Sequence, residues 1–172
     1  MTARAFILRS SSTTENGSQR ATQSSSCRIN DLQVSEHFNL REFQCPCCAL
    51  VKLDSRLITA LESLRANIGG KPIIVTSGYR CSDHNKMLCG AINSDHLHGW
   101  AADIVVRGMD AHEIALAAEA LPDLIKRIGT YRDRICVHIG VEEREGLPPR
   151  WGQTNTTLRS TYVARVFSRG GG

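Results

Sequence analysis

The sequence lacks any apolar run that approaches the roughly 20 residues needed to cross a bilayer. We therefore predict no membrane span. It also lacks a run of five or more like charges, and its net charge is only +4 over 172 residues. Because nucleic-acid binding generally needs a concentrated basic surface, we do not expect a nucleic acid as partner.

The N-terminal segment lacks the apolar stretch of a secretory signal, so the sequence predicts no signal peptide. It is rich in Ser, Thr, Gln and Arg, and we predict a disordered leader over residues 1–34. The chain is polar again from residue 153 and ends in three glycines, which predicts a flexible tail over 153–172. Residues 35–152 can bury a core of their own, and we expect one domain and a monomer.

The spacing of apolar residues predicts a mixture of helices and short strands in this domain. Helices are expected over 54–68 and 111–121, and strands over 72–76 and 102–106. A polar stretch over 81–100 reads as a long loop with one helical turn near 84–88.

Near the C-terminal end of the domain, the sequence pattern predicts a hairpin. Its strands are expected over 128–131 and 134–141, joined at Arg132 and Asp133. Side chains alternate between the two faces of a strand. One face is expected to hold Ile135, Val137 and Ile139, and the other Cys136, His138 and Gly140.

Three polar residues in these elements could converge on one cation. His96 lies in the long loop, Asp103 opens the strand after it, and His138 lies on the polar face of the hairpin. Two imidazoles and one carboxylate leave a fourth tetrahedral position open, as catalytic zinc sites require. Residue types alone do not decide the matter, because scattered His and Asp residues are common in domains without a metal.

The pattern Ser94-x-His96-x-x-Gly99-x-Ala101-x-Asp103-Ile104 resembles the signature of the M15 peptidases. This family includes D-Ala-D-Ala carboxypeptidases and phage L-alanyl-D-glutamate endolysins. Three further segments resemble the same family in the same order: Phe38-x-x-x-x-Phe43-x-Cys45, Thr76-Ser77-Gly78-Tyr79-Arg80 and Val137-His138-Ile139. The resemblance covers roughly residues 35–151.

The resemblance implies a zinc peptidase that acts on the peptide stems of peptidoglycan. It makes His96, Asp103 and His138 the zinc ligands. It makes Arg80 a catalytic residue that contacts substrate near the scissile bond. Ser77 and Tyr79 could line the same substrate pocket, although Tyr79 could instead belong to the core. It also implies an α+β fold, with a central, mostly antiparallel sheet and helices packed on it, as in the Hedgehog and DD-peptidase domains.

The sequence departs from this family where the general base is expected. Members carry an acid three residues before the last histidine or two residues after it, but positions 135 and 140 are Ile and Gly. Asp133 is our first candidate for the base, followed by Glu142 and Glu143. A second hypothesis follows from the missing acid: a cell-wall-binding module of the same fold that has lost catalysis.

Seven cysteines, an odd number, argue against a fully paired secreted framework. Cys45, Cys47 and Cys48 could bind a second, structural zinc, but no fourth ligand is evident, so thiols are the expected state. Cys81 and Cys89 could pair in an oxidising compartment. Asp95 could orient an imidazole, although an exposed loop position is the default expectation.

Overall fold

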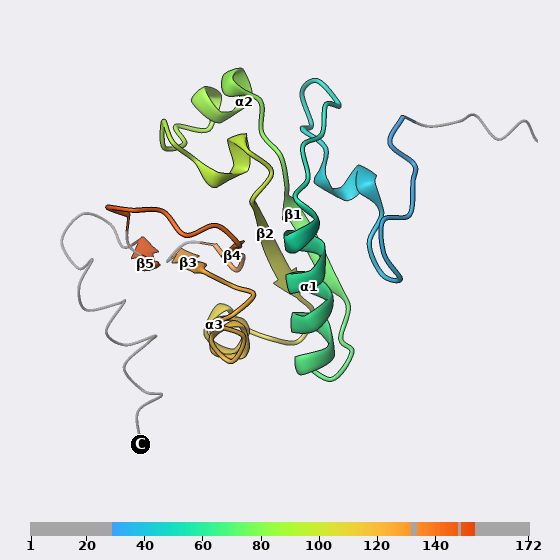
Figure 1. Cartoon of the computed structure of the whole chain (residues 1–172), viewed down its shortest axis with the longest axis vertical. Helices are drawn as coiled ribbons and strands as arrows, with labels where there is room; N and C mark the ends of the chain where they lie inside the picture. The colour runs from blue at the N-terminus through green and yellow to red at the C-terminus, as the bar shows by residue number, and fades with distance from the viewer. Residues whose placement is uncertain (1–28, 132–133, 148, 154–172) are drawn as a thin grey trace, which may run out of the picture.

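The computed structural model describes residues 29–131, 134–147 and 149–153 (Figure 1). The helical elements are η1 (Leu40–Phe43), α1 (Ser55–Asn67), α2 (Ser82–Met87), η2 (Asp95–Leu97) and α3 (Ala111–Glu119). The strands are β1 (Ile73–Ser77), β2 (Ala101–Val106), β3 (Arg127–Tyr131), β4 (Val137–Gly140) and β5 (Arg150–Gln153). The mixture of sheet and helices agrees with the predicted α+β class. No helix in these ranges is both long and apolar enough to cross a membrane.

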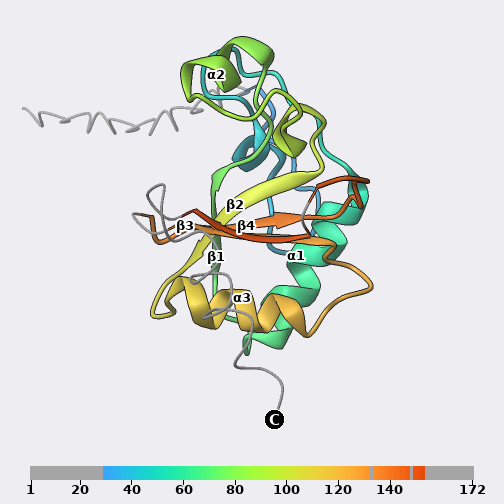
Figure 2. The ribbon, with the colours of Figure 1, turned by 90° about the vertical axis from the view of Figure 1, so that its left-hand side faces the viewer.

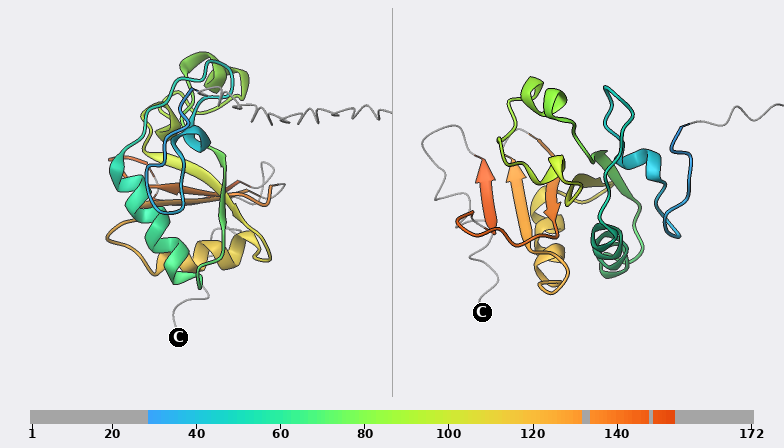
Figure 3. Two further views of the ribbon diagram at one scale, coloured as in Figure 1. Left: turned by 90° about the vertical axis from the view of Figure 1, so that its right-hand side faces the viewer. Right: turned by 45° about the horizontal axis from the view of Figure 1, so that its top comes forward.

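The strands form one five-stranded mixed sheet in the order β1-β2-β4-β3-β5. The pairs β1–β2, β2–β4 and β4–β3 are antiparallel, whereas β3 and β5 are parallel. The right-hand view of Figure 3 shows β3 and β5 pointing the same way, with β4 reversed between β3 and β2. β4 is thus a central strand, which places His138 in the middle of the sheet.

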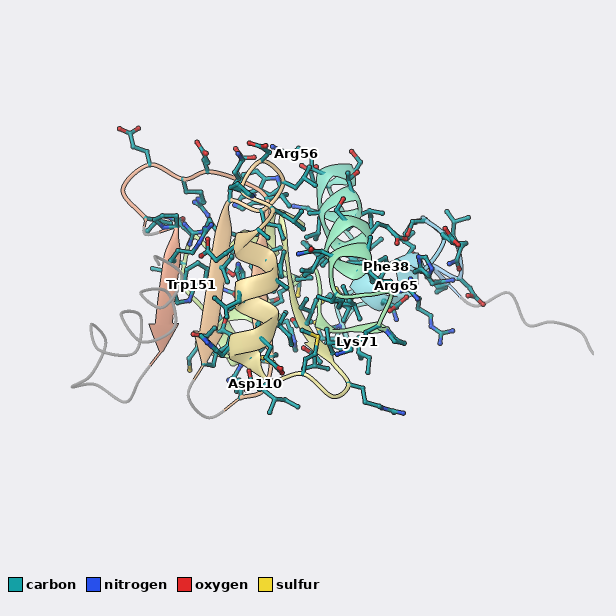
Figure 4. All side chains as sticks on the ribbon, turned by 90° about the horizontal axis from the view of Figure 1, so that it is seen from below. Phe38, Arg56, Arg65, Lys71, Asp110 and Trp151 are labelled. Carbon is teal, nitrogen blue, oxygen red and sulfur yellow. The ribbon has the colours of Figure 1, made fainter. Side chains whose placement is uncertain are left out.

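Helices α1 and α3 pack together against the sheet and close the hydrophobic core. Figure 2 shows α2 and α3 on opposite sides of the strands, and Figure 4, seen from below, shows α3 in front of the strands with α1 beside it. The core is built from fully buried residues of both layers: Leu57, Leu61, Leu64, Ile104, Ile114, Ile128, Val137 and Ile139. The opposite face of β2 and β4 is therefore left for polar residues, because side chains alternate along a strand.

Both long helices begin at aspartate caps. Asp54 accepts a hydrogen bond from the Arg56 backbone N–H, and Asp110 forms a capping box with Glu113. Gly69 and Gly70 follow α1 with φ values of 74° and 76°, a conformation that glycine adopts at little cost. The predicted helices are confirmed to within two residues at each end.

The hairpin and the chain ends differ in part from the prediction. Val137 and Ile139 are buried as expected, but Ile135 precedes β4 and is 76% exposed. Strand β5 was not predicted, because its partner β3 lies some 20 residues earlier and local alternation carries no sign of that pairing. At the other end, the Leu32 carbonyl accepts from the Leu40 N–H, so the described fold includes residues before 35. The rest of the predicted leader and nearly all of the predicted tail lie outside the described residues.

Candidate metal centre and active site

A single row of residues crosses the sheet at the polar face. Ser77 pairs with Asp103, Asp103 with His138, His138 with Gly129, and Gly129 with Trp151. Side chains of directly paired residues lie on the same face and next to each other. The sheet register therefore brings the carboxylate of Asp103 against the imidazole of His138.

His96 reaches the same point from η2. Its Nε2 lies 3.2 Å from Asp103 Oδ1 and 3.1 Å from His138 Nδ1. His138 Nδ1 lies 3.2 Å from the same carboxylate oxygen. All three side chains are buried, and one donor atom from each could hold a metal ion together.

The hydrogen bonds around His96 fit a metal ligand. Its Nδ1 lies 2.7 Å from the Gly78 carbonyl, which can only accept, so Nδ1 carries the proton and Nε2 presents a lone pair. Burial lowers the pKa of His96 and keeps the ring neutral, although the charge of Asp103 opposes this. Two imidazole nitrogens and one carboxylate oxygen are the ligand set of catalytic zinc sites with an open fourth position. The residues present thus fit a zinc ion.

Two glycines allow the loop that carries His96 to approach the rest of the fold. A Cβ on Gly78 would lie 2.5 Å from the Phe43 Cα, and one on Gly99 would lie 2.4 Å from the Lys52 carbonyl oxygen. Gly99 also has a φ of 75°. The chain at Gly99 therefore lies against the Lys52 backbone, where a larger residue would not fit.

Arg80 is held against this centre by two neighbours of the same row. Its Nε donates to Ser77 Oγ at 2.9 Å, and its Nη2 donates to Asp103 Oδ2. Asp103 therefore faces the two histidines with one oxygen and Arg80 with the other. Burial raises the pKa of Asp103, but its contacts with His96 and His138 lower that pKa well below the usual value. Ser77, Arg80 and Asp103 also line a groove of about 630 Å³.

Behind His138 lies a second carboxylate, that of Asp95, which was expected by default at an exposed loop position and could alternatively orient an imidazole. Asp95 is 4% exposed, and its Oδ2 lies 3.6 Å from His138 Nε2. The same oxygen lies 2.8 Å from Arg127 Nε, while Oδ1 lies 3.0 Å from Arg144 Nη1. Burial raises the pKa of Asp95, but contacts with His138, Arg144 and Arg127 lower it to about 2. A buried carboxylate behind an imidazole is the usual support for a histidine ligand.

Comparison with known proteins decides the family. The family model described as Peptidase M15 matches residues 36–140, well over half of the chain. The chain belongs to the M15 peptidase family. Its domain is accordingly that of a hydrolase acting on peptide bonds, and the matched segment contains Arg80, His96, Asp103 and His138. No curated protein matches the chain.

Trp151 is a site residue that the sequence analysis of this M15 domain missed. Its indole lies over Gly129, where a Cβ would come within 2.4 Å of the ring. The centroid of the Trp151 ring lies 4.9 Å from the centroid of the His138 ring. The guanidinium carbon of Arg127 lies 4.8 Å from the same Trp151 centroid. Trp151 thus covers His138 from β5, and only a glycine at 129 leaves room for it. Nothing local in the sequence signals this, because the contact depends on the parallel pairing of β5 with β3.

Other predicted residues of the M15 site lie apart from this centre. Tyr79 is buried, contacts Lys52 through its ring and does not line the groove, so we leave it out of the proposed substrate site. Glu142 pairs with Arg56 at 2.7 Å. Glu142 and Glu143 line a separate hollow with Trp100 and Arg144. Asp133 lies outside the described residues.

Proposed function

We propose that the chain is a zinc metallopeptidase that hydrolyses peptide stems of peptidoglycan, as a D-Ala-D-Ala carboxypeptidase or an L-Ala-D-Glu endopeptidase. The observation that carries the proposal is the meeting of three buried donor atoms from His96, Asp103 and His138 beside a groove lined by Arg80. The family supports peptide hydrolysis. The two histidines and the carboxylate support zinc as the metal.

The side chains around the centre have separable roles in this proposal. A zinc ion bound there would polarise the scissile carbonyl and activate a water molecule. Arg80 would bind a substrate carboxylate or stabilise negative charge that develops on the carbonyl oxygen. Ser77 and Asp103 hold its guanidinium in place, so the arginine is positioned before substrate arrives.

The general base is proposed to be Asp133. Arg134, the next residue in the chain, lines the groove, which supports this proposal. Among described residues, the groove offers one other acid besides Asp103, which is Glu42. Glu42 could not be predicted as a site residue from local patterns, because it lies nearly 100 residues before His138 in the chain.

Replacing Asp133 with asparagine is expected to lower turnover about 10²- to 10⁴-fold, the usual contribution of a general base. Replacing Glu42 with glutamine is the matched variant, since glutamine can keep the N3 position of the capping box with Asn39. Turnover should stay close to wild type in Glu42→Gln. The reverse pattern would transfer the role to Glu42, and wild-type turnover in both variants would exclude both acids.

The proposed function is tested with zinc-loaded protein and purified peptidoglycan or synthetic stem peptides. Chromatography and mass spectrometry of the products should show either free D-alanine or a new amino terminus on D-glutamate. Arg80→Ala is expected to lose hydrolysis while keeping zinc. Zinc-loaded, folded protein that releases no product from any of these substrates would contradict the enzyme proposal.

A binding module that retains zinc is the second candidate function. It is favoured by one observation, the absence of an acid at positions 135 and 140. The candidate would then resemble the Hedgehog signalling domain, in which the zinc is structural and the catalytic base has been lost. Sedimentation of the protein with insoluble peptidoglycan, without product release, would favour this candidate over the peptidase.

A further inference from the structure

Four cysteine side chains meet outside the proposed catalytic centre. Cys45, Cys47 and Cys48 lie in one turn, and Cys81 directly follows the Arg80 segment. Their sulfur atoms all lie within 4.8 Å of one another. The Cys47 sulfur is 3.4 Å from that of Cys45 and 3.3 Å from that of Cys81. The sequence showed three of these residues as a group, and the fold supplies the fourth from more than 30 residues away.

The spacing of the sulfurs suits a metal better than a disulfide. A disulfide needs sulfurs about 2.05 Å apart, so none of the measured pairs is bonded. Four sulfurs around a zinc ion, at about 2.3 Å from it, lie about 3.8 Å from each other. The observed separations of 3.3 Å to at most 4.8 Å bracket that value. Cys89, the alternative partner considered for Cys81, is exposed and is not in the cluster.

Backbone geometry prepares the cluster for thiolates. The Cys81 N–H donates to the Cys45 sulfur at 3.5 Å, and the His84 N–H donates to the Cys81 sulfur at 3.4 Å. Backbone bonds between Cys45 and both Leu50 and Ala49 close the turn. The N–H groups of Cys81 and His84 point at sulfur atoms of the cluster, where they would stabilise thiolate charge.

We propose that Cys45, Cys47, Cys48 and Cys81 bind a structural zinc ion, separate from the one proposed at His96, Asp103 and His138. Four thiolates and no open position are the ligand set of a structural site. The ion would tie the 45–50 turn to Cys81, the residue after Arg80. Figures 1 and 2 show the 45–50 turn and α2 at the same end of the molecule. The neighbouring Tyr79 N–H also donates to the Phe43 carbonyl at 2.8 Å. The metal thus fixes the backbone from which Arg80 projects.

Zinc content, measured by elemental analysis of the reduced full chain after removal of free metal, tests the proposal. Wild type and Cys89→Ser are expected to bind about two zinc ions per chain. Cys47→Ser and Cys81→Ser should each bind about one, and His138→Ala should also bind about one. Cys47→Ser combined with His138→Ala should bind none. Cys47 is exposed, so its replacement creates no cavity that could itself unfold the domain.

Thiol reactivity gives a second readout that does not need a variant to fold. In zinc-loaded wild type, the exposed Cys47 and Cys48 should react slowly with a thiol reagent and quickly after a chelator is added, whereas Cys89 reacts quickly in both cases. Equal zinc content in wild type and Cys47→Ser, or rapid modification of Cys47 and Cys48 in the zinc-loaded protein, would overturn the proposal. Neither zinc content nor thiol reactivity depends on peptide hydrolysis. The cysteine site can therefore be confirmed or overturned even if the proposed enzyme function fails.

Discussion

Replacing His138 with alanine is expected to prevent binding of the zinc ion proposed at the β2–β4 centre and to abolish the proposed peptide hydrolysis. His138 Nδ1 is one of three donors that meet within 3.2 Å, and two remaining donors hold zinc poorly. Loss of the several kcal/mol that a metal contributes to transition-state stabilisation corresponds to a loss of about a thousandfold or more in turnover. Zinc content and turnover on a stem peptide measure the two effects together.

The matched control for this variant is His98→Ala. His98 lies two residues from His96, but its ring stacks on Trp100 at a centroid distance of 4.2 Å and is not part of the donor group. This variant should keep both zinc and turnover. The fold should survive His138→Ala, because Asp95 keeps its pairs with Arg127 and Arg144. A His138→Ala protein with wild-type turnover would show that the centre is not catalytic.

Replacing Asp95 with asparagine is expected to weaken both the fold and the metal site. The buried Arg127 and the partly buried Arg144 would lose their counter-charge, and removing one partner of a buried pair typically costs about 3–5 kcal/mol. The His138 ring would lose the carboxylate behind it, which usually lowers metal affinity about 10- to 100-fold. Thermal unfolding and competition with a zinc chelator measure the two effects. Asp83→Asn is the control, since Asp83 is exposed and should change neither.

The Asp95 variant should also change how stability depends on pH. Asp95 has a folded-state pKa of about 2, below the value of about 3.9 in an unfolded chain. Its stabilising contribution is therefore complete above about pH 4 and is lost as the pH falls toward 2. The stability difference between wild type and Asp95→Asn should narrow over this range. A difference that stays constant from pH 5 to about 2 would show that the carboxylate charge is not the cause.

Asp95 also bears on the acid that is absent from position 140. A Cβ on Gly140 would lie 3.6 Å from Asp95 Oδ2 and 3.1 Å from the Arg127 Cβ. The space beside β4 is therefore already occupied by a carboxylate that comes from the loop before β2. We infer that Asp95 supports His138 from the position where the resemblance places an acid on the strand itself. This explains the glycine without restoring a general base, since Asp95 lies on the far side of His138 from Asp103.

The helices and four of the five strands could be predicted from local patterns because their signals are local. Asp54 and Asp110 are caps followed by apolar residues at helical spacing, and β1 and β2 are short apolar runs. The ends of the hairpin strands were harder to predict. Ile135 has a residue type that suits a core position, but it precedes β4 and is exposed. Hydrophobicity at one position does not say where a strand begins.

The sequence by itself indicated the family, the general fold class and the three residues that meet at the candidate centre, because four of its segments resemble the M15 peptidases in the same order. Only the tertiary structure decided which further residues surround them. Asp95, Trp151 and Glu42 come from segments far apart in the chain, and Cys81 joins the Cys45 turn in the same way. Their contacts follow from strand order, register and the close approach of loops at Gly78 and Gly99. Such contacts arise when the chain packs in three dimensions, and no local pattern in the sequence carries them.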